Sequence, residues 1–287
     1  MAVSNSRKER RSYYSARTGK VSTGGGIDLG ALRRAFRPVF DKLEEQGFFL
    51  VAFGERLGAG WRPGTLGDVR LHILRRLHKE DLWPVQDHLH RYKEDDLFDM
   101  IELMFDHVSK PLKKTQATIL GNGPRFHDFD RKVGCREFRT AINDLLADYK
   151  QGYELTSRGE IRAMPAPGME LLMAEKVRHP DSDNVVVRVE TAKQKFLRRG
   201  GTVEDHRDAV RDLAAVLEYL RPTAKKVLNT KDEADIFRIA NEFGIRHHNQ
   251  QQKTNYDEEI WLSWMFYHFL STIHACVRLI QRSSSTP

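Results

Sequence analysis

The sequence predicts a mainly helical protein with one small β-hairpin. Apolar residues recur at helical spacing along most of residues 28–282, and clusters of glycine and proline divide these stretches into separate helices. One clear segment alternates apolar and polar residues around a turn, near residues 153–162. The chain has 287 residues, 40% of them hydrophobic, which is enough for one large or two ordinary domains with a real core.

Residues 1–26 predict a flexible basic arm, because they are polar and end in three glycines. Residues 1–37 hold nine Lys/Arg and two acidic residues, which leaves 38 of each sign among the other 250 residues. A basic surface covering the whole protein is therefore excluded. The arm by itself would at most raise nonspecific attraction to RNA.

We expect a helical N-terminal domain over residues 27–183. Its predicted helices cover 28–47, with Asp28 as the N-cap, then 69–78, 81–91, 95–110 and 126–149. Residues 54–68 contain five glycines and predict a loop or a set of turns. That loop lacks the GK[ST] ending of a phosphate-binding loop, so nucleotide binding is disfavoured.

The C-terminal domain, residues 184–287, is predicted to be a bundle of four helices. The helical patterns cover 185–199, 202–220, 230–243 and 256–282, with short connections between them. Thr202 stands at the start of the second pattern as its expected cap. Residues 260–280 are apolar over a length that could span a membrane, but His268 and His274 interrupt the run. A helix buried nearly all round, in a core or a dimer interface, is the better interpretation.

The cysteine usage and the N-terminus both favour a cytoplasmic protein. Cys135 and Cys276 stand far apart and predict ordinary reduced thiols rather than a disulfide framework or a cysteine-based zinc site. No apolar segment follows the basic residues at the N-terminus, so no secretory signal is predicted.

The densest polar group in the sequence lies between the last two predicted helices. There Arg246, His247 and His248 are followed by Asn249 and three glutamines. Imidazole moves protons near neutral pH, and a guanidinium stabilises charge that develops on a phosphate. These groups suit RNA cleavage without a metal or another cofactor, because the 2′-hydroxyl of RNA supplies the nucleophile.

Two other interpretations of this loop stay open. From local composition alone, the plainer interpretation is a solvated connection whose histidines cap a helix or form hydrogen bonds at the end of the bundle. A metal site would need His247 and His248 to join His268 or His274. Adjacent histidines point in different directions and no carboxylate motif stands beside them, so no metal is expected.

Several basic residues could accompany such a site. Lys225, Lys226 and Arg238 precede the loop in the sequence and would suit contacts with an RNA backbone, although a solvated helix face is the plainer interpretation. In the N-terminal domain, four histidines lie among arginines and give a second candidate phosphate-binding face, again against a solvated one: His72, His78, His88 and His90.

The C-terminal half resembles a known family. The sequence RIANEFGIRHHN, residues 238–249, leads into the apolar helix DEEIWLSWMFYHFLSTIHACVRLI, and this arrangement is similar to the HEPN superfamily, particularly the abortive-infection proteins of bacterial phage defence. The segments DLWPVQDHL, DDLFDMIELMFDHVSKP and NDLLADYKQGYELTSRGEI resemble the helical domain that precedes HEPN modules in such proteins. The resemblance covers roughly residues 28–282.

The resemblance implies a HEPN-like four-helix bundle that forms a homodimer, with the two Arg-His-His-Asn loops facing each other. It also implies an endoribonuclease toxin or effector that cleaves RNA, tRNA included, without a metal. His247 or His248 would act as general base or acid, Arg246 would stabilise charge on the phosphate, and Asn249 and Asn241 would contact RNA. Arg246 lies directly beside both histidines, which departs from the spacing of arginine and histidine in the active members of the family. A non-catalytic RNA-binding or protein-interaction module, such as a sensor or an antitoxin-like partner, is therefore the alternative.

Overall fold

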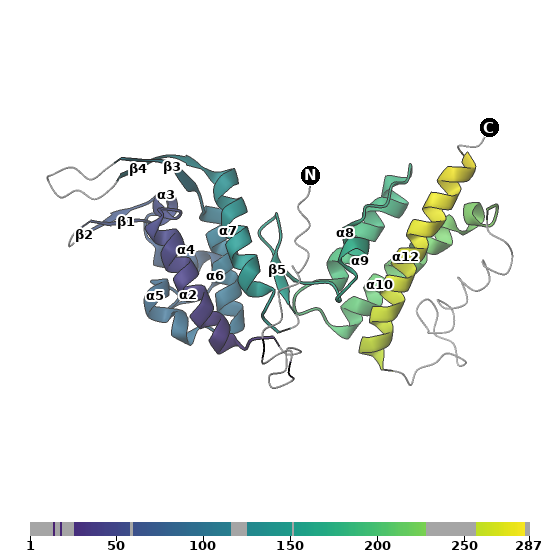
Figure 1. Ribbon diagram of the computed structural model, residues 1–287, viewed down its shortest axis with the longest axis horizontal. Coiled ribbons are helices and arrows are strands. Elements are labelled where there is room, and N and C mark those ends of the chain that lie inside the picture. Colours follow the sequence, from purple (N-terminus) through teal and green to yellow (C-terminus); the bar gives the residue numbers. More distant parts are fainter. Residues whose placement is uncertain are drawn as a thin grey trace. The chain divides into compact units, whose positions relative to one another are not determined.

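The computed structural model describes Tyr14, Thr18 and residues 26–57, 60–115, 125–150, 152–227 and 257–284. The protein is mostly helical, as the sequence predicts, and it also has small two-stranded sheets. Its chain forms two compact units, an N-terminal unit that ends at Met164 and a C-terminal unit that starts at Pro165 (Figure 1). Each unit is described by itself.

The N-terminal unit contains three longer helices, several short ones and three hairpins. The longer helices are α2 (Leu29–Glu45), α6 (Glu94–His107) and α7 (Arg131–Leu146). The shorter ones are α3 (Leu50–Phe53), α4 (Val69–Leu77), α5 (Val85–His88) and the 3-10 turn η1 (Leu89–Arg91). The strands are β1 (Gly54–Leu57), β2 (Gly60–Pro63), β3 (Lys110–Thr115), β4 (Arg125–Asp130), β5 (Tyr153–Leu155) and β6 (Ile161–Ala163).

The core of this unit is rich in aromatic rings. Phe36, Phe40, Phe49 and Phe53 form a continuous stack, with successive ring centroids 6.1, 5.6 and 5.5 Å apart. All four are fully buried, so α2 and α3 share one apolar face against α6 and α7. The N-cap predicted for α2 is confirmed, because the Asp28 carboxylate accepts a hydrogen bond of 2.7 Å from the Ala31 N–H.

The prediction of a single hairpin is wrong for this unit. The β5–β6 hairpin is where the sequence places it, with Tyr153 paired to Ala163. Residues 54–63, however, form β1 and β2 rather than only turns, and residues 110–130 contribute β3 and β4. Both additional pairs are antiparallel.

The helix predicted over 126–149 begins only at Arg131. Residues 125–130 pair instead with β3, and the Asp130 side chain caps α7 by accepting a hydrogen bond of 3.0 Å from the Val133 N–H. The helix predicted over 81–91 is reduced to α5 and η1, because Pro84 precedes its first turn. In both segments a contact or a proline overrides a helical pattern of apolar residues.

The regular elements described in the C-terminal unit are all helical. Its elements are α8 (Glu170–Ala174), the π-helical turn η2 (Ser182–Val187), α9 (Arg188–Phe196), α10 (Val203–Ala224) and α12 (Glu258–Ser284). The helix predicted over 230–243 lies outside the described residues. Thr202 caps α10 as predicted, and α10 continues through Pro222 beyond the predicted end.

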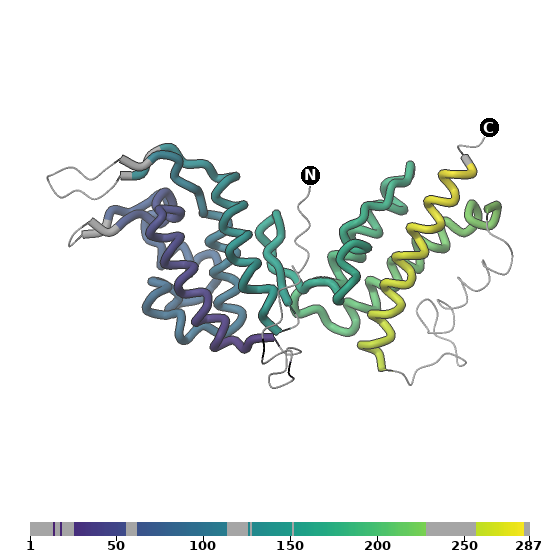
Figure 2. Tube along the Cα trace, viewed as in Figure 1, coloured from purple at the N-terminus to yellow at the C-terminus, as the bar shows by residue number. Residues whose placement is uncertain are grey.

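The helix α10 packs against both α9 and α12, and α12 runs alongside it (Figure 2). One face of α12 is fully buried in this core, at Leu262, Met265, Phe266, Phe269, Leu270 and Ile273. The opposite face exposes Ile260, Trp261 and Trp264, so the burial of α12 within the chain is one-sided rather than all round. Among the helices that the structure describes, α12 included, none has the length and apolar character to cross a membrane.

The chain divides into its two units between Met164 and Pro165, earlier in the sequence than the predicted boundary between residues 183 and 184. Met173 and Val177 belong to the core formed by α9, α10 and α12. The Tyr267 hydroxyl of α12 accepts a hydrogen bond of 2.9 Å from the Ala166 N–H. Residues 165–183 therefore belong with the C-terminal helices, which their proline-rich and polar composition does not indicate.

Candidate functional site

The predicted catalytic residues Arg246, His247 and His248 lie outside the described residues. The same is true of Asn249, Asn241 and Arg238, which were predicted to contact RNA. The structure describes Lys225 and Lys226, which follow the last turn of α10. The Lys225 N–H donates to the Arg221 carbonyl at 2.9 Å and closes the helix, and Lys226 is exposed to solvent.

The described chain resumes after this loop at Asp257, directly before α12. The Asp257 carboxylate accepts a hydrogen bond of 3.1 Å from the Ile260 N–H, and its carbonyl accepts one of 3.0 Å from the Trp261 N–H. Asp257 is thus the N-cap of α12. The next residue, Glu258, forms an ion pair of 2.7 Å with Arg207 of α10.

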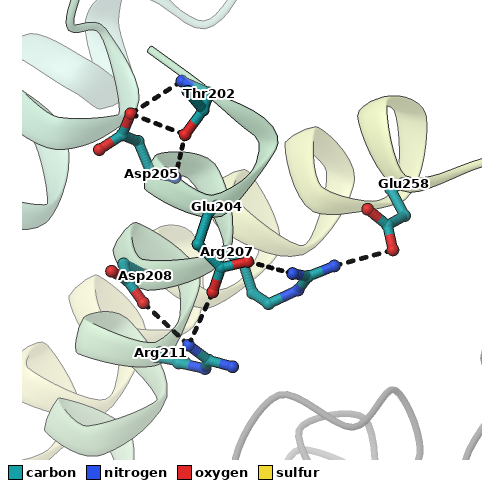
Figure 3. A network of polar contacts seen from close by, with 7 residues as sticks. All are labelled: Thr202, Glu204, Asp205, Arg207, Asp208, Arg211 and Glu258. Atoms are coloured by element: carbon teal, nitrogen blue, oxygen red, sulfur yellow. Dashed lines mark hydrogen bonds and ion pairs between the residues drawn. The ribbon is translucent and has the colours of Figure 1, made fainter.

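Arg207 belongs to a network of charged side chains at the start of α10 (Figure 3). Besides Glu258 it pairs with Glu204. Arg211 pairs with the same Glu204 at 3.2 Å and with Asp208 at 2.9 Å. Both guanidinium groups are therefore held by carboxylates, so this network fixes the first turn of α12 against α10 rather than offering free cations to a phosphate.

The same turn of α10 carries a reciprocal cap. The Thr202 hydroxyl accepts a hydrogen bond from the Asp205 N–H at 3.2 Å, and the Asp205 carboxylate accepts one from the Thr202 N–H at 2.8 Å (Figure 3). These hydrogen bonds lower the pKa of Asp205, because they stabilise its charged form. The sequence predicts the cap, whereas the ion pairs between helices depend on the tertiary fold.

The two histidines considered as metal ligands, His268 and His274, lie on α12. The His268 ring stacks on Trp264, with the centroids 5.2 Å apart. Burial lowers the pKa of both imidazoles. Within the described ranges, no three His, Cys, Asp or Glu side chains are placed to hold a metal ion together.

The four histidines of the N-terminal unit do not form one face. His78 and His90 are exposed, whereas the His72 ring lies 5.1 Å from that of His107, at the end of α6. Burial lowers the pKa of both members of this pair, and for His107 the neighbouring His72 lowers it further. His72 is partly buried beside His107, so it does not share one exposed face with His78 and His90.

A pocket that the sequence does not single out lies in the same unit, between the β1–β2 hairpin and β4. Apart from the aromatic and basic residues along β4, nothing in the sequence indicates it, because its walls come from segments far apart in the chain.

Comparison with known proteins adds no relative: no family model, curated protein or solved structure matches this chain.

Proposed function

We propose that the protein is a metal-independent endoribonuclease that acts as a toxin or effector in anti-phage abortive infection. The observation that carries the proposal is the triplet Arg246-His247-His248 in the connection that leads into α12. It is supported by the contacts of α12 at the end of that connection, where Asp257 caps the helix and Glu258 pairs with Arg207.

The proposed reaction uses the RNA's own hydroxyl. One histidine, His247 or His248, removes the proton from a 2′-hydroxyl, whose oxygen forms a bond to the adjacent phosphorus. The bond between phosphorus and the 5′-oxygen breaks, and the other histidine donates a proton to that oxygen. Arg246 stabilises the additional negative charge on the phosphate during the transfer. The products are a 2′,3′-cyclic phosphate and a 5′-hydroxyl.

The further parts of the proposal follow from the family resemblance. The protein acts in the cytoplasm as a homodimer formed through its C-terminal helices, and the two loops face each other across the dimer axis. Asn241, Asn249, Arg238, Lys225 and Lys226 contact the RNA backbone.

Cleavage of total RNA or tRNA in the presence of EDTA tests this function. We expect the wild-type protein to leave 2′,3′-cyclic phosphate ends, and Arg246→Ala and His247→Ala to reduce cleavage at least about 100-fold, the scale of one general acid–base or charge-stabilising group. Arg158→Ala is the matched control, since Arg158 is exposed and lies in the other unit. Equal cleavage by the wild type and the Arg246 and His247 variants would contradict the proposal.

A non-catalytic RNA-binding or protein-interaction module is the second candidate. It is favoured by residues 110–132, which hold six Lys/Arg and two Asp in an otherwise charge-balanced body. Wild-type protein that binds RNA but leaves it intact, with or without added divalent metal, would support this alternative.

A further inference from the structure

A cavity of about 310 Å³ opens in the N-terminal unit between two hairpins. Its residues come from α3, from the β1–β2 hairpin and from β4: Leu50, Val51, Gly54, Glu55, Arg62, Pro63, Phe126 and Phe129. Figure 1 shows both hairpins extending from the same end of this unit. The volume is at the low end for small-molecule pockets, which span about 300–1,000 Å³, and it suits a single ring system.

Two aromatic rings of one strand line this cavity, which a regular strand would not allow. Phe126 and Phe129 are three positions apart, and residues at that spacing face opposite sides of a regular strand. Between them Asp128 has a φ of 53°, in the left-handed region. The register between β3 and β4 is the same on both sides of Asp128, so no residue is inserted there, and both rings line the cavity on either side of this distorted residue.

The position of Phe126 is fixed by close packing. Gly47 has a φ of 81°, and a Cβ added there would lie 3.1 Å from the Phe126 ring. The ring therefore lies directly against the backbone of the turn after α2. Phe129, in contrast, keeps 36% of its surface exposed.

One wall of the cavity is polar. Glu55 and Arg62 face each other across the β1–β2 hairpin and form an ion pair there. The Glu55 side chain is 22% exposed and that of Arg62 61% exposed. A carboxylate that accepts hydrogen bonds and a guanidinium that donates them thus stand beside two aromatic rings.

Basic residues recur in the sequence of the same two strands. Lys114 pairs in register with Phe126, and Arg125 precedes Phe126 on β4. Lys113 extends into solvent and pairs with Asp128 at 2.7 Å. Basic residues interleaved with aromatic ones are the pattern by which proteins hold single-stranded nucleic acid, because the cations follow the phosphates while the bases stack on the rings.

We propose that this cavity binds one unstacked base of single-stranded RNA. The base lies against Phe126 and Phe129, its polar edge meets Glu55 and Arg62, and the basic residues of β3 and β4 hold the neighbouring phosphates. The inference rests on the proposed function only for the choice of RNA as ligand. It places an RNA-binding site in the N-terminal unit, apart from the predicted catalytic loop.

The test is binding of a fluorescently labelled 2′-O-methyl RNA octamer, which has no nucleophile and cannot be cleaved by the proposed reaction. We expect Phe129→Ala to weaken binding by about 5- to 150-fold, the range for loss of one base–aromatic stack. Leu112→Ala is the matched control, since Leu112 is 58% exposed on the same hairpin but does not line the cavity. We expect it to change the affinity less than about twofold, because no stack is lost.

A competitor of equal length with abasic sugars separates a base pocket from attraction to phosphates alone. We expect it to displace the labelled octamer much less well than an intact competitor. Equal displacement by both, or unchanged affinity of a folded Phe129→Ala protein, overturns the proposal. Cleavage of ordinary RNA by the wild-type protein is measured separately. If Phe129→Ala loses binding and the wild type does not cleave, the base pocket is supported and the nuclease function is rejected. If the wild type cleaves and Phe129→Ala binds as the wild type does, the nuclease function is supported and the base pocket is rejected.

Discussion

The buried amide of Asn143 connects α7 to the β5–β6 hairpin. Its side-chain N–H donates to the Leu155 carbonyl at 3.2 Å, and its side-chain oxygen accepts from the Leu155 N–H at 2.6 Å. The side chain thereby satisfies both backbone groups of one residue of a strand. In the sequence, Asn143 interrupts the apolar pattern of this helix face. Only the folded structure gives the reason, which is the pair of hydrogen bonds to Leu155.

Replacing Asn143 by Ala should lower the free energy of unfolding by about 2–4 kcal/mol, because both backbone groups of Leu155 would stay buried without partners. Urea unfolding followed by circular dichroism measures this. Thr140→Ala is the control, since Thr140 is exposed on the same helix and bonds only to the carbonyl one turn earlier among the contacts described. A similar loss for both variants would contradict the assigned role of Asn143.

Lys193 is a buried charged residue that, like Asn143, is explained by its partners in the fold. Its side chain is only 5% exposed, yet the ammonium group donates to the Glu175 carbonyl at 2.7 Å and pairs with Glu190 at 3.0 Å. A buried ammonium group persists in a core only with such partners. Lys193 thereby attaches α9 to the chain that follows α8.

At the level of elements, the central contact of the C-terminal unit is the pair α10 and α12. The two helices share an apolar core, and Arg207 joins their first turns through Glu258. This ion pair is partly exposed, with the side chains 24% and 40% accessible, so its contribution to stability is small. Its importance is geometric, because it fixes the residue at which the proposed catalytic connection enters α12.

A double-mutant cycle of Arg207→Ala and Glu258→Ala should give a coupling energy of about 0.2–1 kcal/mol at low salt. We expect the coupling to shrink in about 1 M salt, where charges on the surface are screened. Thermal or urea unfolding of the four proteins measures it. A coupling that does not respond to salt would show that the two side chains interact other than by charge.

Local signals predict the helices of this protein better than its strands. The caps at Asp28 and Thr202 and the glycine turn of β5–β6 are local, and each is where the sequence places it. The strands β3 and β4 pair across the intervening residues 116–124, and β4 carries a helix-like spacing of apolar residues. Pairing between distant segments leaves little trace in local periodicity, which is why 126–130 was predicted as helix.

On the scale of the whole molecule, the chain has two separate apolar cores, one in each unit. Each unit also holds partly or fully buried histidines: His72 and His107 in the first unit, His268 and His274 in the second. Burial lowers the pKa of all four below the usual value of 6.5. The folded protein therefore binds protons less readily than the unfolded chain.

Stability should consequently fall as the solution becomes acidic. The contribution of these histidines is complete above their unfolded pKa near 6.5 and is lost as the pH drops toward their lower folded values. We expect the urea midpoint to be lower at about pH 5.5 than at about pH 7.5, two values on either side of the unfolded histidine pKa. A midpoint that stays level or rises over this range would contradict the prediction.

The sequence by itself determined the helical class, the main helices with their caps, the position of one hairpin and the residues of the proposed catalytic loop, because these depend on local spacing and side-chain chemistry. The tertiary structure decided which segments share a core, where the two units divide, how α12 is attached to α10, and that Phe126 and Phe129 meet Glu55 and Arg62 in one cavity. Such features join residues far apart in the chain, so their energies appear only when the chain is folded.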